Sequence, residues 1–312
     1  MRQVINSLCP VCESNDHDYL IDYRGKNKLF INLKLVRCKV CNLVHVAPMP
    51  SVSNLEEYNI TYFLNAHGGR PVDPFINAFF IGIARLRIDY INKYLKDKAI
   101  SDLTVMEYGP AFGYFAHEWL SMYPKTTYFG CETDESCHSA LSETGVQLIS
   151  HSLINNTNTH YDLIVMSHVL EHIANPYEFL ESTSKKLSTG GVIFIEVPCR
   201  DWEYKSNIEP HLLFFDKLSI TYLLKKIGLD NIQVTYHGEE IESIKSQKFL
   251  HTKVMQLRDK LIRHGVTTPF ARKKEGMEML NNPIERAMIA PFKAHCESEK
   301  PSRWLRAIAT KY

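Results

Sequence analysis

Residues 105–115 read Val-Met-Glu-Tyr-Gly-Pro-Ala-Phe-Gly-Tyr-Phe and predict a buried strand, a glycine turn and the start of a helix. Gly109 and Gly113 let the backbone approach a ligand closely, and the helix start supplies unpaired amide groups. The dinucleotide fingerprint G-x-G-x-x-G is not present, because Ala111 holds the position of the second glycine. The strand also ends on a carboxylate, Glu107, which would repel a pyrophosphate and suits a ligand with a cationic amino group.

The alternation of strand and helix continues along the chain. Each apolar run is followed by a turn and then by a helical pattern, and the runs are continuously apolar rather than half polar. Such strands are typical of a parallel sheet in an α/β fold, which binds ligands beyond the carboxyl ends of its strands. The expected strands are 104–107, 127–131, 146–149, 161–166, 192–197 and 231–235, and the expected helices are 75–96, 114–122, 176–187 and 216–226.

The second of these strands ends at Gly130-Cys131-Glu132. An acidic residue about 20 positions beyond a glycine turn is placed to bind ribose hydroxyls. Ribose hydroxyls and an ammonium group, without a pyrophosphate, are features of S-adenosylmethionine. The sequence therefore predicts a site for this methyl donor between Glu107, the glycine turn and Glu132.

Four motifs, in this order, resemble those of class I S-adenosylmethionine-dependent methyltransferases. They are Glu107-x-Gly-x-x-x-Gly, Gly130-Cys-Glu132, Tyr161-Asp-Leu-Ile-Val-Met-Ser-His-Val-Leu-Glu-His172 and Gly190-Gly-Val-Ile-Phe-Ile-Glu-Val-Pro198. The resemblance covers about residues 100–235 and implies a Rossmann-like sheet. The cofactor contacts that it implies are Glu107, Gly109, Pro110, Ala111 and Gly113 for the methionine moiety, Glu132 for the ribose, Ser152 and Leu153 for the adenine, and Ser167 and His168 beside the methyl donor. Tyr114 and Thr133 are further implied contacts.

Four of the eight cysteines stand in two pairs, Cys9-Pro-Val-Cys12 and Cys38-Lys-Val-Cys41. Two such knuckles can direct four thiolates at one tetrahedral zinc ion with no open position for chemistry, and the metal then stabilises a segment too small to bury its own core. The alternative is two unrelated pairs, one of them redox-active. A redox pair belongs near a βαβ unit, and both pairs lie outside the one found here. We therefore expect a structural zinc site.

The zinc knuckles, a proline-rich linker and a tyrosine-rich helix before this fold resemble the deoxysugar C-methyltransferases, which act on nucleotide-linked 4-keto sugars. In that family a histidine base follows the fifth strand, and His211 matches it in the segment Glu209-Pro-His-Leu-Leu-Phe-Phe. The resemblance implies catalytic roles for His211 and Glu209, and for Tyr62 near the substrate. Two departures weaken the 4-keto sugar assignment: Pro210 separates the family's glutamate and histidine, and the chain is too short for its second C-terminal α/β domain.

Other histidines compete for the role of base. His168 and His172 flank Val169-Leu-Glu at the end of the fourth strand, so at least one should face the cleft. Their spacing also suggests a metal pair, but no nearby third ligand supports it. A histidine that titrates near neutrality can remove a proton from carbon or from a hydroxyl, so the acceptor atom (C, O or N) stays open.

Composition sets the remaining expectations. The 312 residues carry a net charge of +1 with 45% hydrophobic and 23% charged residues, typical of a globular protein without a general attraction for nucleic acid or an acidic membrane. No apolar run could span a bilayer and the start does not resemble a secretory signal, so we expect a cytoplasmic protein. The expected organisation is a zinc-binding β-rich module over 1–50, a helical linker or substrate lid over 51–100, the methyltransferase domain over 101–240 and a basic helical extension over 241–312. Prolines interrupt the helical pattern of this extension.

The favoured interpretation is a methyltransferase for a sugar, either a nucleotide-linked deoxysugar or a surface-glycan precursor. The acceptor could instead be another small metabolite. A third reading, of another class, is a catalytically inactive zinc-containing scaffold, which the intact Glu107, Gly109, Gly113 and Glu132 oppose. A zinc-finger nucleic-acid protein is disfavoured by the neutral charge. The oligomeric state is left open.

Overall fold

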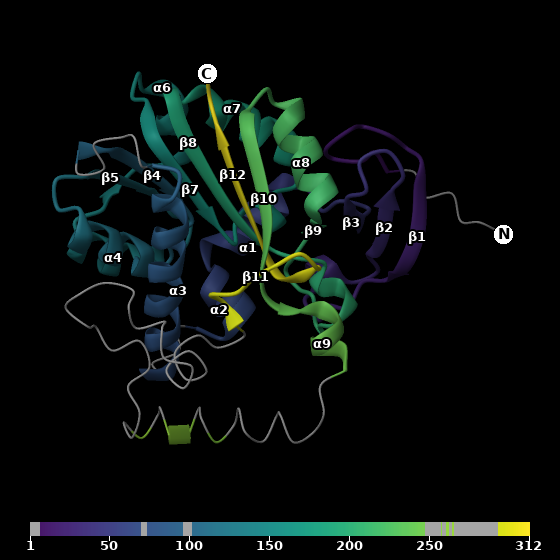
Figure 1. The fold of residues 1–312 in the computed structure, drawn as a ribbon. Coiled ribbons are helices and arrows are strands. Elements are labelled where there is room, and N and C mark those ends of the chain that lie inside the picture. Colours follow the sequence, from purple (N-terminus) through teal and green to yellow (C-terminus); the bar gives the residue numbers. More distant parts are fainter. Residues whose placement is uncertain are drawn as a thin grey trace.

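The structure is a computed structural model that describes residues 7–69, 74–95, 102–246 and 293–312, together with 257, 260, 261 and 264. Within this part of the chain the strands form two sheets (Figure 1). The larger has eight strands in the order β11-β10-β12-β8-β7-β4-β5-β6, and the smaller has four in the order β1-β2-β3-β9. The larger sheet is the α/β domain predicted from the glycine turn.

The centre of the large sheet is parallel, as predicted. β4 pairs in parallel with both β5 and β7, and β7 pairs in parallel with β8. Because these strands all point the same way, their carboxyl ends meet at one edge. The parallel strands are β4 (Thr104–Tyr108), β5 (Thr127–Cys131), β6 (Gln147–Leu148), β7 (Tyr161–Ser167) and β8 (Leu187–Pro198).

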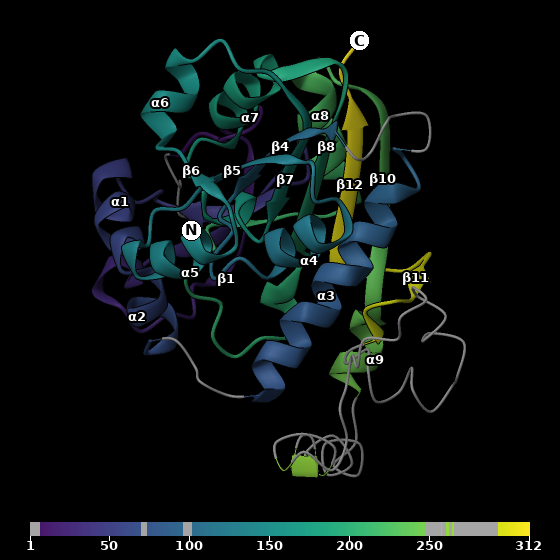
Figure 2. The same cartoon turned by 90° about the vertical axis from the view of Figure 1, so that its left-hand side faces the viewer.

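Helices cover both faces of this sheet, which explains why its strands are continuously apolar. Val105 and Val165 pack against α3 and α4, whereas Met106 and Met166 pack on the opposite face with α7 and α8. Figure 2 shows α3 and α4 on the near side of the sheet. The helices of the domain are α3 (Pro74–Asn92), α4 (Tyr114–Met122), α5 (His138–Glu143), α6 (His151–Asn156), α7 (Pro176–Lys185) and α8 (Lys217–Lys226), with short 3-10 helices η3 (Glu135–Cys137), η4 (Leu170–His172) and η5 (Asp201–Glu203).

The end of the chain is a strand, so the predicted helical extension over 241–312 is wrong in its last part. β12 (Ser302–Thr310) lies between β8 and β10 (Asp230–Glu240) and is antiparallel to both (Figure 1). A strand inside a sheet is buried on both faces, so its run of alanines and large apolar residues carries no period-2 signal. Helix α9 (Ile241–Lys245) and strand β11 (Glu297–Ser298) are also present, while most of 247–292 lies outside the described residues.

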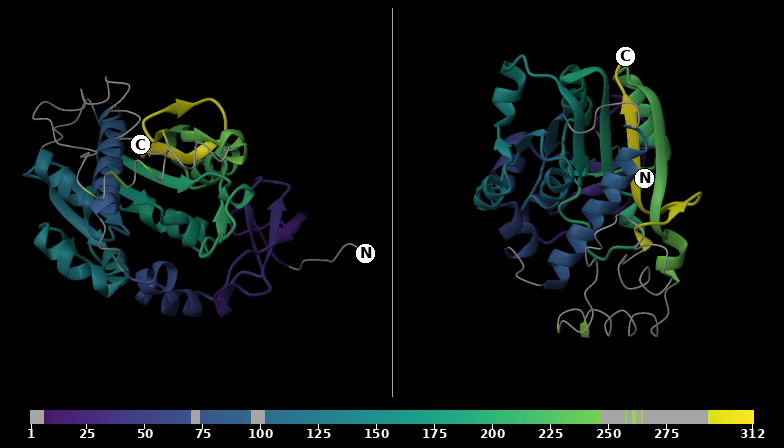
Figure 3. Two further views of the ribbon diagram at one scale, coloured as in Figure 1. Left: turned by 90° about the horizontal axis from the view of Figure 1, so that it is seen from below. Right: turned by 60° about the vertical axis from the view of Figure 1, so that its left-hand side comes forward.

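Residues 7–50 are rich in β-strands, and a fourth strand of their sheet comes from far along the chain. β1 (His17–Asp22), β2 (Lys34–Cys38) and β3 (Val44–Ala47) form an antiparallel meander with a short helix η1 (Lys28–Phe30), and β9 (Leu213–Phe214) pairs with β3. Figure 3 shows this small purple sheet at one end of the molecule. One continuous core joins it to the face of the large sheet that carries α7 and α8.

Two short helices connect the module to α3. They are α1 (Val52–Ile60) and α2 (Tyr62–His67), which lie below the large sheet in Figure 1. The N–H of Phe63 donates to Asp134 Oδ2 (2.8 Å), so α2 is tied to the loop that follows β5. The role of residues 51–100 as a linker or substrate lid stays a prediction. None of the described helices combines the length and the apolar character needed to cross a lipid bilayer.

Candidate functional site

The glycine turn between β4 and α4 adopts an alternating backbone. Gly109, Ala111 and Gly113 have φ values of +63°, +52° and +76°, in the left-handed region that glycine enters most readily. A Cβ atom at Gly109 would lie 2.7 Å from Val169 Cγ2, so no larger residue fits there without displacement. Ala111 adopts the conformation that the missing second glycine would have had. The turn therefore keeps its shape despite the departure from the fingerprint.

Glu107 lies at the carboxyl end of β4 and is only 3% exposed. Its Oε2 accepts a hydrogen bond of 2.6 Å from the Tyr128 hydroxyl on β5. Burial raises the pKa of Glu107 to about 7, although the bond from Tyr128 and the charge of Arg87 act in the opposite direction. A carboxyl group with this pKa would gain charge when a cation approaches.

Glu132, after β5, joins the two loops of the predicted cofactor site. Its Oε2 accepts from the Ala111 N–H and its Oε1 from the Asp134 N–H, both at 2.9 Å. Each carboxylate oxygen has two acceptor positions, so ribose hydroxyls can still donate to it. Burial raises the pKa of Glu132. The adjacent Thr133 is exposed.

Ser167, another predicted cofactor contact, lies at the same edge of the sheet. Within the described residues, the buried Ser167 Oγ at the end of β7 has no hydrogen-bond partner. Ser152 and Leu153 lie on α6, which follows β6, and Leu153 is 55% exposed. Three features of this edge fit an S-adenosyl nucleoside. They are the Ser167 hydroxyl, which has no partner among the described residues, the turn at Gly109, where no larger side chain fits, and the Glu132 carboxylate, which binds that turn.

A cluster of rings lies beside the carboxyl end of β7. The ring centroids of His172 and His211 are 5.0 Å apart, and those of Tyr62 and His172 are 5.5 Å apart. Burial lowers the pKa of His172 to about 4, with His211 acting in the same direction, so His172 is neutral at physiological pH. The structure therefore brings together Tyr62, His172 and His211, three of the predicted catalytic side chains.

A carboxylate that the sequence analysis missed accompanies His211. Asp201 is 1% exposed, and its Oδ2 lies 2.9 Å from His211 Nδ1 and 2.7 Å from Lys205 Nζ. Among the described residues, neither contact meets the angular criteria of a hydrogen bond. Asp201 therefore acts on His211 mainly through its charge. Although burial opposes it, the proximity of His211 and Lys205 holds the pKa of Asp201 well below its usual value. The sequence could have indicated Asp201, because it is an acidic residue just after the fifth predicted strand.

His168 is held between two carboxylates. Its Nδ1 lies 3.2 Å from Glu171 Oε1 and its Nε2 lies 3.5 Å from Glu196 Oε1. Burial works to lower the pKa of His168, but the contacts with both carboxylates outweigh it and raise the pKa. Arg87 and Arg306 also pair with Glu196, at 2.5 and 2.6 Å. The partly exposed His168 is thus paired with two buried carboxylates, so it is not a free base.

Glu209 does not pair with His211. Its Oε2 accepts from the backbone N–H groups of Lys26 (2.7 Å) and Asn27 (3.0 Å) in the N-terminal module. Because Pro210 stands between Glu209 and His211, the two side chains serve different neighbours. The structure places Glu209 as an anchor between the module and the segment that carries His211.

The sequence disfavoured a metal pair of His168 and His172, and the structure groups a different set of possible ligands. One ligand atom each from Glu171, His172 and His211 lie within 4.8 Å of one another. The third ligand, absent from the local sequence, comes from a segment almost 40 residues away. These three groups could hold a divalent cation.

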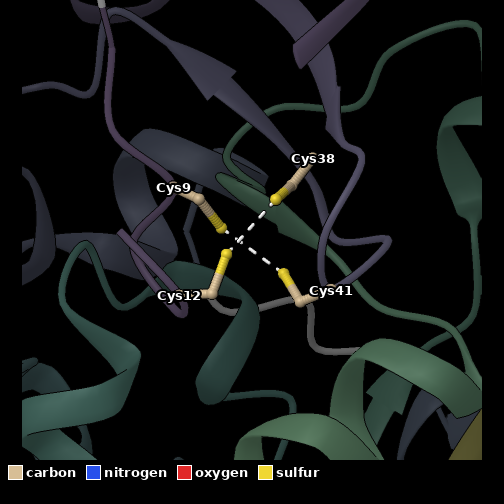
Figure 4. A group of neighbouring side chains, drawn as sticks. All are labelled: Cys9, Cys12, Cys38 and Cys41. Atoms are coloured by element: carbon tan, nitrogen blue, oxygen red, sulfur yellow. Dashed lines mark hydrogen bonds between the residues drawn. The ribbon is translucent and has the colours of Figure 1, made fainter. Parts of the chain in front are cut away.

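The four cysteines of the two knuckles converge as predicted (Figure 4). The sulfur atoms of Cys9 and Cys41 are 3.5 Å apart, those of Cys12 and Cys38 are 3.3 Å apart, and all four lie within 4.8 Å of one another. None of the eight cysteines forms a disulfide. Four thiol groups in a tight cluster have the donor set and spacing of a tetrahedral zinc site.

Comparison with known proteins identifies the domain. Residues 82–234 match the family model described as a methyltransferase domain, a stretch that includes the glycine turn, Glu132 and the histidine cluster. The chain thus contains a methyltransferase domain, and the protein is an S-adenosylmethionine-dependent methyltransferase. No curated protein matches the chain.

Several solved methyltransferase structures are similar to this chain. One is a methyltransferase from Thermotoga maritima, described as a possible histamine N-methyltransferase, with 16% identity and a TM-score of 0.47 over 76% of this chain and 93% of that chain. Another is a methyltransferase from Archaeoglobus fulgidus, with 14% identity and a TM-score of 0.47 over 80% and 98% of the two chains. A third is coclaurine N-methyltransferase, with 14% identity and a TM-score of 0.44 over 72% and 70%.

Proposed function

We propose that the protein transfers a methyl group from S-adenosylmethionine to a carbon or oxygen atom of a sugar, with His211 as the general base. The sugar would be a nucleotide-linked deoxysugar or a glycan precursor. The observation that carries this proposal is the contact of 2.9 Å between Asp201 and His211 beside the ring cluster. A buried carboxylate next to one ring nitrogen favours the tautomer in which the other nitrogen can accept a proton.

The arrangement supports a simple sequence of roles. Bound S-adenosylmethionine supplies an activated methyl group, so the chain has to align the acceptor and remove its proton. His211 Nδ1 faces Asp201, which leaves Nε2 for the acceptor. The proton that leaves the acceptor then resides on His211, and the ionised Asp201 stabilises the resulting imidazolium.

The surroundings of His211 favour a small polar acceptor. Tyr62 and His172 present ring faces and edges, which suit the C–H faces of a sugar, and their polar atoms suit its hydroxyls. Glu132 would hold the ribose of the cofactor, and Glu107 with the glycine turn would hold its methionine end. The Ser167 hydroxyl would form a hydrogen bond with the cofactor. These roles follow from the positions at the sheet edge.

We also propose that Cys9, Cys12, Cys38 and Cys41 bind one structural zinc ion. The support is the cluster of four sulfur atoms, three of which belong to buried cysteines. Four thiolates leave no open coordination position, so this ion would stabilise the module without taking part in methyl transfer.

The test is a panel of nucleotide sugars, both 4-keto and reduced, incubated with the enzyme and S-adenosylmethionine. A mass increase of one methyl group on one class of sugar, abolished in His211→Gln, is the expected result. If no sugar is methylated while another small metabolite is, the sugar assignment is wrong and the methyltransferase activity stands. Methylation at the wild-type rate by His211→Gln would remove His211 as the base.

A further inference from the structure

The segment that carries Asp201 and His211 is bound along its length by the N-terminal module. The Tyr23 hydroxyl, just after β1, is shared between the backbone carbonyls of Ile208 (3.2 Å) and His211 (3.0 Å). It therefore contacts the backbone of the proposed base directly. The Tyr23 ring stacks on Phe30, with centroids 5.8 Å apart, which fixes the direction of the hydroxyl.

Arg24 binds the same segment nearer its start. Its guanidinium donates to the carbonyls of Trp202 and Lys205, the second at 2.9 Å. Its own carbonyl accepts from the Ile208 N–H at 3.0 Å. Trp202 and Lys205 follow Asp201 within four residues, so Arg24 binds the turn that begins at this carboxylate.

Three further hydrogen bonds join the module to the end of this segment. Glu209 accepts from the N–H groups of Lys26 and Asn27, and the Val46 N–H donates to the Leu212 carbonyl at 3.0 Å. β9 then pairs with β3, so the chain leaves His211 as a strand of the small sheet. The segment 201–214 begins at the end of a large-sheet strand and ends within the module.

The methyltransferase domain holds the other side of this segment. The Leu212 N–H donates to the Glu171 carbonyl at 2.8 Å, and the His211 ring meets the His172 ring. Two neighbouring residues, His211 and Leu212, are thus bound by the module through their carbonyls and by the domain through an N–H and a ring. The distance between His211 and the carboxyl edge of the large sheet therefore depends on the position of the N-terminal module.

We propose that the N-terminal module is a positioning element for methyl transfer, with Tyr23 and Arg24 as the positioning residues that set the place of His211 and Asp201. The inference rests on the proposed function, because it assigns a purpose to the contacts around the proposed base. It also gives the cysteine site a consequence: a metal bound there would stabilise β1 and β2, the strands that precede and follow Tyr23 and Arg24.

Tyr23→Phe is the test variant, because it removes the hydroxyl and keeps the ring on Phe30. A displacement of about 1 Å at a reacting group can lower a rate by about 100-fold, so we expect kcat to fall at least about 10-fold. The Kd for S-adenosylmethionine and the number of sites in calorimetry should stay at wild-type values. Tyr19→Phe is the matched control, since Tyr19 lies on β1 and its hydroxyl binds only the exposed neighbour Asp22.

A double-mutant cycle separates positioning from general stabilisation. If Tyr23 acts through His211, Tyr23→Phe should cause no further loss of residual turnover in a His211→Gln background. Equal losses in both backgrounds, or wild-type kcat in Tyr23→Phe and Arg24→Met, would overturn the proposal while His211 remains the base. If His211→Gln itself turns over at the wild-type rate, the proposed base is wrong, and the two failures are therefore distinguishable.

Discussion

Asp201 Oδ2 lies 2.9 Å from His211 Nδ1, and the two residues are brought together by a segment that leaves the large sheet and enters the small one. Asp201→Asn keeps the shape of the side chain and removes its charge. We expect kcat to fall by about 100-fold or more, because the charge that stabilises the imidazolium is lost. Steady-state kinetics with an unchanged Kd for S-adenosylmethionine would support this role, whereas an unchanged kcat would remove it.

If Glu107 holds the amino group of the methyl donor, as proposed, binding of the donor should depend on pH. Because burial raises its pKa to about 7, the carboxyl group is largely protonated below that pH and binds a cationic amino group weakly. The affinity for S-adenosylmethionine should therefore rise between pH 6 and 8, by at most about tenfold per pH unit. Calorimetry at several pH values measures this, and Glu107→Gln should flatten the dependence. The same slope in the variant would exclude Glu107 as its source.

Glu132→Ala removes the carboxylate assigned to the ribose and its bonds to Ala111 and Asp134. We expect the Kd for S-adenosylmethionine to increase about 10- to 100-fold, since one or two charge-assisted hydrogen bonds are lost. Glu135→Ala is the control, because Glu135 is an exposed acidic residue three positions further on. Equal affinities of the two variants would contradict the ribose role.

Cys9→Ser tests the metal centre. The wild type should contain about one zinc ion per chain by elemental analysis, and the variant should lose it together with part of the thermal stability of the module. Cys296→Ser, at a cysteine outside the cluster, should keep the metal. A wild-type protein purified without metal and unable to bind added zinc would end this assignment.

His168 should stabilise the fold most at low pH. Its pKa is raised in the folded state, because its contacts with the carboxylates of Glu171 and Glu196 outweigh burial. Its contribution is therefore complete below about pH 6.5 and is lost as the pH rises through the folded value. Because the His168 side chain is 36% exposed and solvent screens its contacts, His168→Gln should lower the free energy of unfolding by about 1 kcal/mol or less at pH 6, and by less at pH 9. Denaturant titrations at both pH values measure the difference. If the difference in unfolding free energy between wild type and variant increases with pH, His168 is not stabilising the fold as an imidazolium.

Local patterns were sufficient for the class of protein. The run from Val105 to Phe115, the acidic residue after the next strand and the paired cysteines all act through neighbours in the chain or through the regular geometry of a parallel sheet. Glycine conformations, strand ends and knuckles depend on a few consecutive residues, so the sequence determined the sheet, the edge that binds the cofactor and the grouping of the four cysteines. It was wrong about the final strand, because a strand buried on both faces lacks the alternation that distinguishes it from a helix.

Only the tertiary structure decided how the proposed base is built. His211 meets His172, Asp201 and the Tyr23 hydroxyl across distances in the chain that no local pattern encodes, and Glu209, expected beside His211, binds the module instead. Such contacts depend on how two sheets pack around one core, and packing selects among many partners of similar chemistry. The chain sequence therefore determined the class of enzyme, and the packing of the module against the domain decided which side chains surround the proposed base.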